Sequence, residues 1–157
     1  MKKIFIIFLL LFTFSQASLI SKNYNNAIGV RGLFDGGITY KQFVDNTKAF
    51  EVILSGGDKW FGLTGFYQWH NKTHAKQLEW YYGAGVHAVF IEDHKHTPWD
   101  RNTDTDLVLG VDGILGIEYS FREVPIVVSA DWNPTLNLIG DSGLWLSRGS
   151  VSIRYYW

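Results

Sequence analysis

Three residues of this chain have the types needed for acyl transfer: a serine nucleophile, a histidine base and a carboxylate to orient it. They are Ser129, His87 and Glu118, and each lies on the polar face of a segment that alternates apolar and polar residues. The chain has no Gly-x-Ser-x-Gly motif, which presents the nucleophile in many hydrolases. If the polar faces point inward, the three side chains are also hidden from a large substrate. We therefore predict no catalytic residues.

One segment carries histidines and acids that could bind a divalent cation. Around His94 and His96 lie five carboxylates, Glu92, Asp93, Asp100, Asp104 and Asp106, and imidazole and carboxylate are common metal ligands. Their spacing matches no fixed ligand pattern, so we expect a solvated loop without a metal or another cofactor. The absence of cysteine excludes disulfides, a thiol nucleophile and thiolate ligands. A net charge of -1 leaves no basic patch for nucleic acid.

The elements that must position these side chains are β-strands. From Leu107 to Phe121 the odd positions are apolar or glycine, whereas the even positions include Asp112, Glu118 and Ser120. This period of two predicts a strand with one apolar and one polar face, because a helix would scatter the charges and glycines around its circumference. Similar segments bring the number of predicted strands to eight, over residues 28–34, 38–44, 50–54, 61–70, 78–90, 107–121, 126–133 and 150–157.

The polar faces of these segments carry nine charged residues of nearly balanced sign. The cations are Arg31, Lys41, Arg148 and Arg154, and the anions are Glu51, Glu79, Asp112, Glu118 and Asp131. An unpaired buried charge is costly, whereas hydrogen-bonded pairs offset the loss of water. Paired carboxylates could also form an active site, but buried ion networks are more often structural. We predict that the polar faces point into a closed interior and form an ion network there.

The N-terminal residues resemble a secretory signal peptide. Lys2 and Lys3 precede an apolar run over residues 4–12, and the small-residue triplet 15–17 follows. We expect cleavage after Ala17, which leaves one domain over residues 18–157. No later run reaches the roughly 20 residues of a transmembrane helix, so a mature chain that enters a membrane must do so as a closed barrel. The predicted fold is an all-β, eight-stranded, antiparallel up-and-down transmembrane barrel.

Aromatic residues and loop lengths indicate how such a barrel would sit in a bilayer. Six aromatic side chains are expected at the membrane interfaces: Trp69, Trp80, Tyr119, Phe121, Trp132 and Trp157. The two longest connections, residues 92–106 and 134–147, are expected on the extracellular side, where they could bind an external ligand. The tight turn at Arg122-Glu123 is expected in the periplasm. Because side chains fill an eight-stranded barrel, no solute pore is expected.

The chain resembles the small outer-membrane β-barrels of Gram-negative bacteria, of the OmpA/OmpX type. Besides the signal peptide, the resemblance lies in residues 80–87, 111–119, 126–134 and 151–157, and the motifs over 111–119 and 126–134 are similar to those of uncharacterised barrels of the Bacteroidetes. It implies residence in the outer membrane, contact with its lipids and lipopolysaccharide, and insertion by the barrel-assembly machinery. It implies no single activity, because a fold does not determine a function.

The expected role is therefore structural, in envelope integrity or in surface interaction, without catalysis. Two alternatives in the membrane are a lipid A-modifying enzyme and a narrow channel for ions or very small solutes. A soluble secreted barrel that holds an apolar ligand is the third. A soluble barrel needs apolar residues inside, whereas here the face opposite the aromatic one carries the charges.

Overall fold

The computed structural model describes residues 24–34, 36–58, 60–75, 77–91, 107–140 and 142–157. Ten strands form over these ranges: β1 (Asn26–Leu33), β2 (Gly37–Phe43), β3 (Lys48–Gly57), β4 (Trp60–Lys72), β5 (Leu78–Ile91), β6 (Leu107–Ser120), β7 (Ile126–Trp132), β8 (Thr135–Ile139), β9 (Gly143–Trp145) and β10 (Gly149–Tyr156). In the described ranges no helix is long and apolar enough to cross a membrane. The expected signal peptide at 1–17 and the loop at 92–106 lie outside the described residues.

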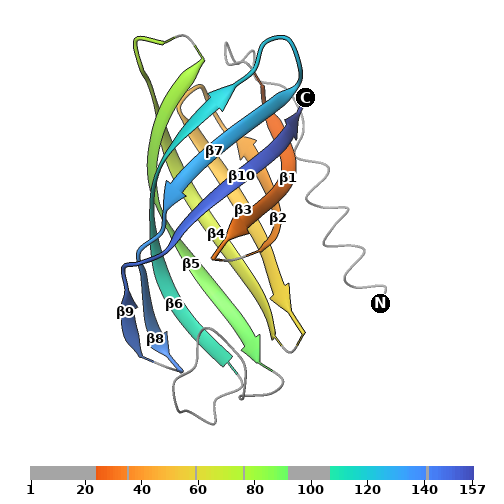
Figure 1. The fold of residues 1–157 in the computed structure, drawn as a ribbon. Coiled ribbons are helices and arrows are strands. Elements are labelled where there is room, and N and C mark those ends of the chain that lie inside the picture. The colour runs from red at the N-terminus through yellow and green to blue at the C-terminus, as the bar shows by residue number, and fades with distance from the viewer. Residues whose placement is uncertain (1–23, 35, 59, 76, 92–106, 141) are drawn as a thin grey trace.

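The strands form a closed antiparallel barrel (Figure 1). Neighbours along the chain pair from β1 to β7, β10 lies between β1 and β7, and the β5–β6 pairing closes the sheet. Strand β8 continues the line of β7, because both pair with β6 in the same register on either side of Pro134. The barrel therefore has eight positions around its wall, which confirms the predicted eight-stranded fold.

The segment 134–147 differs from the predicted long loop. Most of it forms β8 and β9, a short hairpin beside β6 (Figure 1). Pro134 has no N–H, but its carbonyl accepts a hydrogen bond from Gly113 N at 2.8 Å, so the pairing with β6 continues past it. Residues 135–138 also keep the alternation, with Thr135 and Asn137 buried and Leu136 and Leu138 exposed. The expectation of a loop was wrong here because the strand resumes after the proline.

Burial is inverted relative to a soluble protein. Along β10, Val151, Ile153 and Tyr155 are exposed, whereas Ser152 and Arg154 are buried. Strand β6 repeats this pattern, with apolar residues such as Leu115 outside and acidic residues inside. The apolar side chains that would form the core of a soluble barrel thus cover its outer wall.

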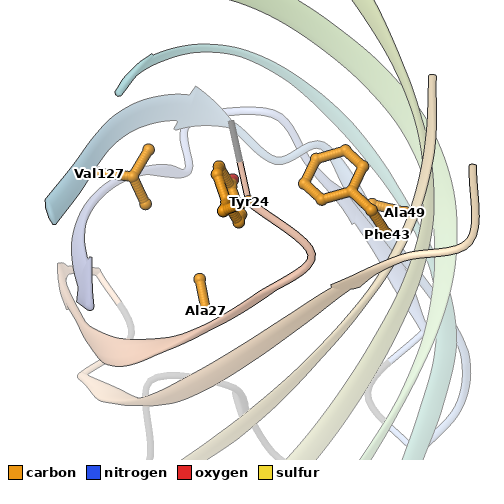
Figure 2. Close-up of a cluster of buried hydrophobic side chains, with 5 residues drawn as sticks. All are labelled: Tyr24, Ala27, Phe43, Ala49 and Val127. Carbon is orange, nitrogen blue, oxygen red and sulfur yellow. The ribbon is translucent and has the colours of Figure 1, made fainter. Parts of the chain in front are cut away.

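The interior is layered along the barrel axis, with three apolar clusters. One lies at the end of the barrel where the C-terminus lies, here called the C-terminal rim, and contains Tyr24, Ala27, Phe43, Ala49 and Val127 (Figure 2). A central cluster contains Ile53, Phe66, Tyr81 and Ile114. The third, near the opposite rim, contains Val89, Ile91 and Val108, with Trp60 packed against it. Polar side chains occupy the levels between these clusters.

Candidate functional site in the barrel interior

An ion cluster lies between the C-terminal rim cluster and the central cluster. Arg154 on β10 is bonded to Glu51 on β3, and its Nη1 lies 3.7 Å from Glu118 Oε2 on β6. Lys41 on β2 has its Nζ 2.8 Å from Glu118 Oε2 and 3.6 Å from Glu51 Oε2. The side chains of all four residues are at most 1% exposed. Two cations and two anions from four strands therefore neutralise one another inside the barrel.

Neutral side chains complete the hydrogen bonding of this cluster. Arg154 donates from Nη1 to Ser129 Oγ at 2.8 Å and from Nε to Thr39 Oγ1 at 3.3 Å. Gln68 donates from Nε2 to Glu51 Oε2 at 2.5 Å, and the Tyr24 hydroxyl donates to Glu118. Buried charges are tolerated when such bonds replace their lost hydration. The arrangement suits a rigid, dry filling of the barrel.

A second ion pair lies beside the central cluster. Arg31 donates from Nη1 and Nη2 to the two carboxylate oxygens of Asp131, at 3.1 and 2.5 Å, and from Nη2 to Asn133 Oδ1 at 2.6 Å. The Tyr81 hydroxyl donates to the same carboxylate at 2.9 Å. This two-pronged geometry gives strong and directional hydrogen bonds. The ion pair links β1 to β7, and the hydrogen bond from Tyr81 adds β5.

A further polar layer lies between the central cluster and the opposite rim. His87 Nδ1 lies 2.8 Å from Asp112 Oδ2, and Thr135 donates to Asp112 Oδ1 at 2.7 Å. Arg148 donates from Nη1 to Thr135 Oγ1 at 3.0 Å. These side chains, together with Arg31, line a cavity of about 20 Å³, which has room for about one water molecule. The cavity is far too small for a solute.

The ninth charged residue of the predicted set, Glu79, lies near the C-terminal rim. Its Oε2 is 3.3 Å from His70 Nδ1, and its side chain is 15% exposed. Glu79 and Glu118 are opposite one another across β5 and β6, so His70 and two carboxylates come together as a group that could hold a metal ion. His70 and Gln68 lie in the predicted strand over residues 61–70 but were not among the predicted site residues. The only sequence signal for their inward position was the alternation of Gln68 and His70 with the apolar Trp69.

The hypothetical catalytic trio is not brought together. Ser129 lies opposite Glu118 across β6 and β7 but accepts its hydrogen bond from Arg154. His87 pairs with Gly110, eight positions along β6 from Glu118, which corresponds to about 26 Å of strand. A base this far from the serine cannot take its proton. This geometry removes the serine–histidine–carboxylate arrangement that the sequence raised.

Five of the six expected interface aromatics lie near the C-terminal rim. Trp80 and Trp69 are close to the ends of β5 and β4, Tyr119 and Phe121 close to the end of β6, and Trp157 follows β10. All are exposed except the half-buried Trp69. Trp132 differs, because it lies at the far end of β7 opposite Leu115, about midway along β6. Its Nε1 donates to the Leu146 carbonyl at 2.5 Å.

Comparison with known proteins identifies the fold. No protein-family model matches the chain, and no curated protein matches it. Among solved structures, it is similar to the N-terminal β-barrel domain of OprF from Pseudomonas aeruginosa, with a TM-score of 0.56 and 15% sequence identity. The similarity covers 84% of this chain and 95% of that one. At this identity the likeness shows the fold alone, which is a closed eight-stranded antiparallel β-barrel like that of the OprF domain.

Proposed function

We propose that this chain is an integral outer-membrane β-barrel with a structural, envelope-integrity or surface-interaction role. The observation that carries the proposal is its inverted burial, with ion pairs inside and exposed apolar side chains outside. Along β6 the outward residues run from Leu107 to Tyr119, which are twelve residues apart in the sequence. With a rise of about 3.3 Å per residue and a tilt of 35–45°, they span about 28–32 Å. That height matches the hydrocarbon core of a bilayer, roughly 30 Å.

The proposed orientation places the C-terminal rim in the periplasm. The aromatic side chains near this rim form stacked or edge-on pairs, such as Tyr119 with Phe121 and Tyr155 with Trp157. Amphipathic rings favour the interface between lipid and water. The partners are then the outer-membrane lipids and lipopolysaccharide, with the barrel-assembly machinery during insertion. A ligand-binding role for residues 92–106 and for the β8–β9 hairpin remains a prediction.

The filled interior supports a structural role over a channel. In the described part of the chain, three apolar clusters, the ion cluster around Arg154 and the Arg31–Asp131 ion pair occupy the interior. An ion that crossed the barrel would have to displace several of these side chains. Purified protein in planar bilayers should therefore show no stable conductance. A steady ion current would instead favour the narrow channel.

Membrane fractionation tests the localisation. The protein should sediment with outer membranes, resist carbonate extraction and migrate differently on gels with and without boiling. Release by carbonate or high salt would refute the membrane assignment. Mass spectrometry of lipid A from cells with and without the protein tests the enzyme alternative, and we expect identical spectra. A modification that appears only in cells with the protein would contradict a non-catalytic role.

A further inference from the structure

Three ligands from adjacent strands converge near the C-terminal rim. His70 on β4, Glu79 on β5 and Glu118 on β6 each offer one atom, and these atoms lie within 4.8 Å of one another. His70 and Glu118 are buried, whereas the side chain of Glu79 is partly exposed to solvent. The contribution of one side chain by each of three neighbouring strands gives the group a rigid frame.

A hydrogen bond outside the group determines which ring nitrogen of His70 carries the proton. The amide nitrogen of Gln68 donates to Glu51, so the amide oxygen is the atom that lies 3.2 Å from His70 Nε2. Because that oxygen can only accept, Nε2 must carry a proton. Nδ1, which faces Glu79 Oε2 at 3.3 Å, is then the nitrogen that can bind a cation. Metal-binding histidines are usually oriented in this way through their other nitrogen.

The two carboxylates also favour a cation between them. Glu79 and Glu118 occupy directly opposite positions on β5 and β6 and both point inward. Like charges in this position destabilise a sheet. Lys41 and the Tyr24 hydroxyl orient Glu118 from the side of the ion cluster that contains Arg154. A cation beside His70 Nδ1 would lie close to both carboxylates and would be attracted to each of them.

We propose that His70 Nδ1, Glu79 and Glu118 form a binding site for a divalent metal ion of the zinc class. Tetrahedral zinc has ligands at about 2.0–2.2 Å, so neighbouring ligand atoms lie roughly 3.3–3.5 Å apart. The distance of 3.3 Å between His70 and Glu79 fits this geometry, and the widest separation must shorten on binding. The imidazole nitrogen selects zinc over calcium and magnesium, which prefer oxygen ligands. The bound ion would join β4, β5 and β6 near the rim.

Zinc binding to the folded, detergent-solubilised barrel tests this proposal. The protein should carry no polyhistidine tag and should have His94 and His96 replaced by alanine, because those imidazoles could bind zinc elsewhere. Calorimetric titration with zinc chloride should give one site per barrel, and magnesium chloride should give none. H70A and E79Q should each weaken zinc binding by at least about tenfold. H74A, which changes an exposed histidine in the β4–β5 turn, is the matched control and should bind like the parent.

Two further measurements show whether a loss of zinc binding comes from the site itself or from misfolding. The mobility difference between boiled and unboiled samples shows whether each variant is folded, and only folded variants are compared. Nitrogen-15 NMR of the parent reports the His70 ring directly, and saturating zinc should shift the Nδ1 resonance while Nε2 stays protonated. Equal zinc affinity in H70A and the parent would refute the site. If both nitrogens stay protonated at saturating zinc, the cation is a proton and the metal assignment is wrong.

Discussion

Replacement of Leu115 by arginine probes whether the outer wall contacts lipid. Leu115 is 47% exposed on the outward face of β6, so arginine would not disturb the packed interior. It would instead place a charge in the surrounding medium. In water such a change is nearly neutral, whereas in hydrocarbon it is costly.

The magnitude follows from the depth of the residue. Five positions separate Leu115 from Ser120 at the end of β6, which corresponds to about 12–14 Å along the barrel axis at a tilt of 35–45°. This is close to the middle of an apolar band about 25 Å tall. L115R should therefore lower the free energy of unfolding by about 2–4 kcal/mol, whereas Y119R near the interface should cost about 0–1 kcal/mol from its charge.

Guanidinium unfolding of protein inserted in lipid vesicles, followed by tryptophan fluorescence, measures the change in the free energy of unfolding for L115R and for Y119R. L115A serves as the control, because it removes the leucine side chain without adding a charge. The difference between L115R and L115A isolates the cost of the charge. If this difference is below about 1 kcal/mol, or if Y119R costs as much as L115R, the assignment of the outward face to the bilayer is wrong.

Three further changes test the interior and a turn. R154M removes the guanidinium from two buried carboxylates and should lower the free energy of unfolding by about 3–5 kcal/mol in the same assay; a cost below 1 kcal/mol would mean that the ion cluster is not closely coupled. G116V should cost about 1–3 kcal/mol of stability, because a Cβ at Gly116 would lie 2.6 Å from a ring carbon of a buried tyrosine. A Cβ at Gly65 meets nothing within 4 Å, so G65V should be tolerated. Equal costs for the two variants would contradict the packing. The backbone N–H of Thr47 holds the pKa of Asp45 below its usual value, so Asp45 stabilises the fold above about pH 4 and this contribution is lost as the pH falls through the lowered pKa. The stability difference between the parent and D45A should accordingly shrink in acid, and a difference that grows would contradict the hydrogen bonding of the turn.

The strands and their inward faces could be predicted because both depend on a local period of two. Glu51 and Arg154 each lie between two apolar or aromatic residues, and this alone places them on the polar face. Which of them meet could not be predicted in this way. Arg154 and Glu51 are 103 positions apart in the sequence, and their contact depends on how the tilted strands are staggered when the barrel closes.

The errors of the sequence reasoning also have physical causes. The segment 134–147 was expected to be a loop, but the carbonyl of Pro134 accepts a hydrogen bond from Gly113 and keeps the register with β6. The pairing of His70 with Glu79 was missed because their convergence follows from the pairing of β4 with β5.

A nitroxide scan along β6 tests whether the barrel spans the membrane with its apolar face in contact with lipid. The chain has no native cysteine, so single cysteines can be introduced at each position from 108 to 119 and labelled in outer-membrane vesicles. If β6 spans the bilayer, oxygen, which concentrates in hydrocarbon, should collide most with labels at odd positions, with a maximum near Leu115. Labels at even positions should be inaccessible to oxygen and to a water-soluble relaxant. Odd positions that are instead accessible to the water-soluble relaxant, or a scan without alternation, would contradict a barrel that spans the membrane.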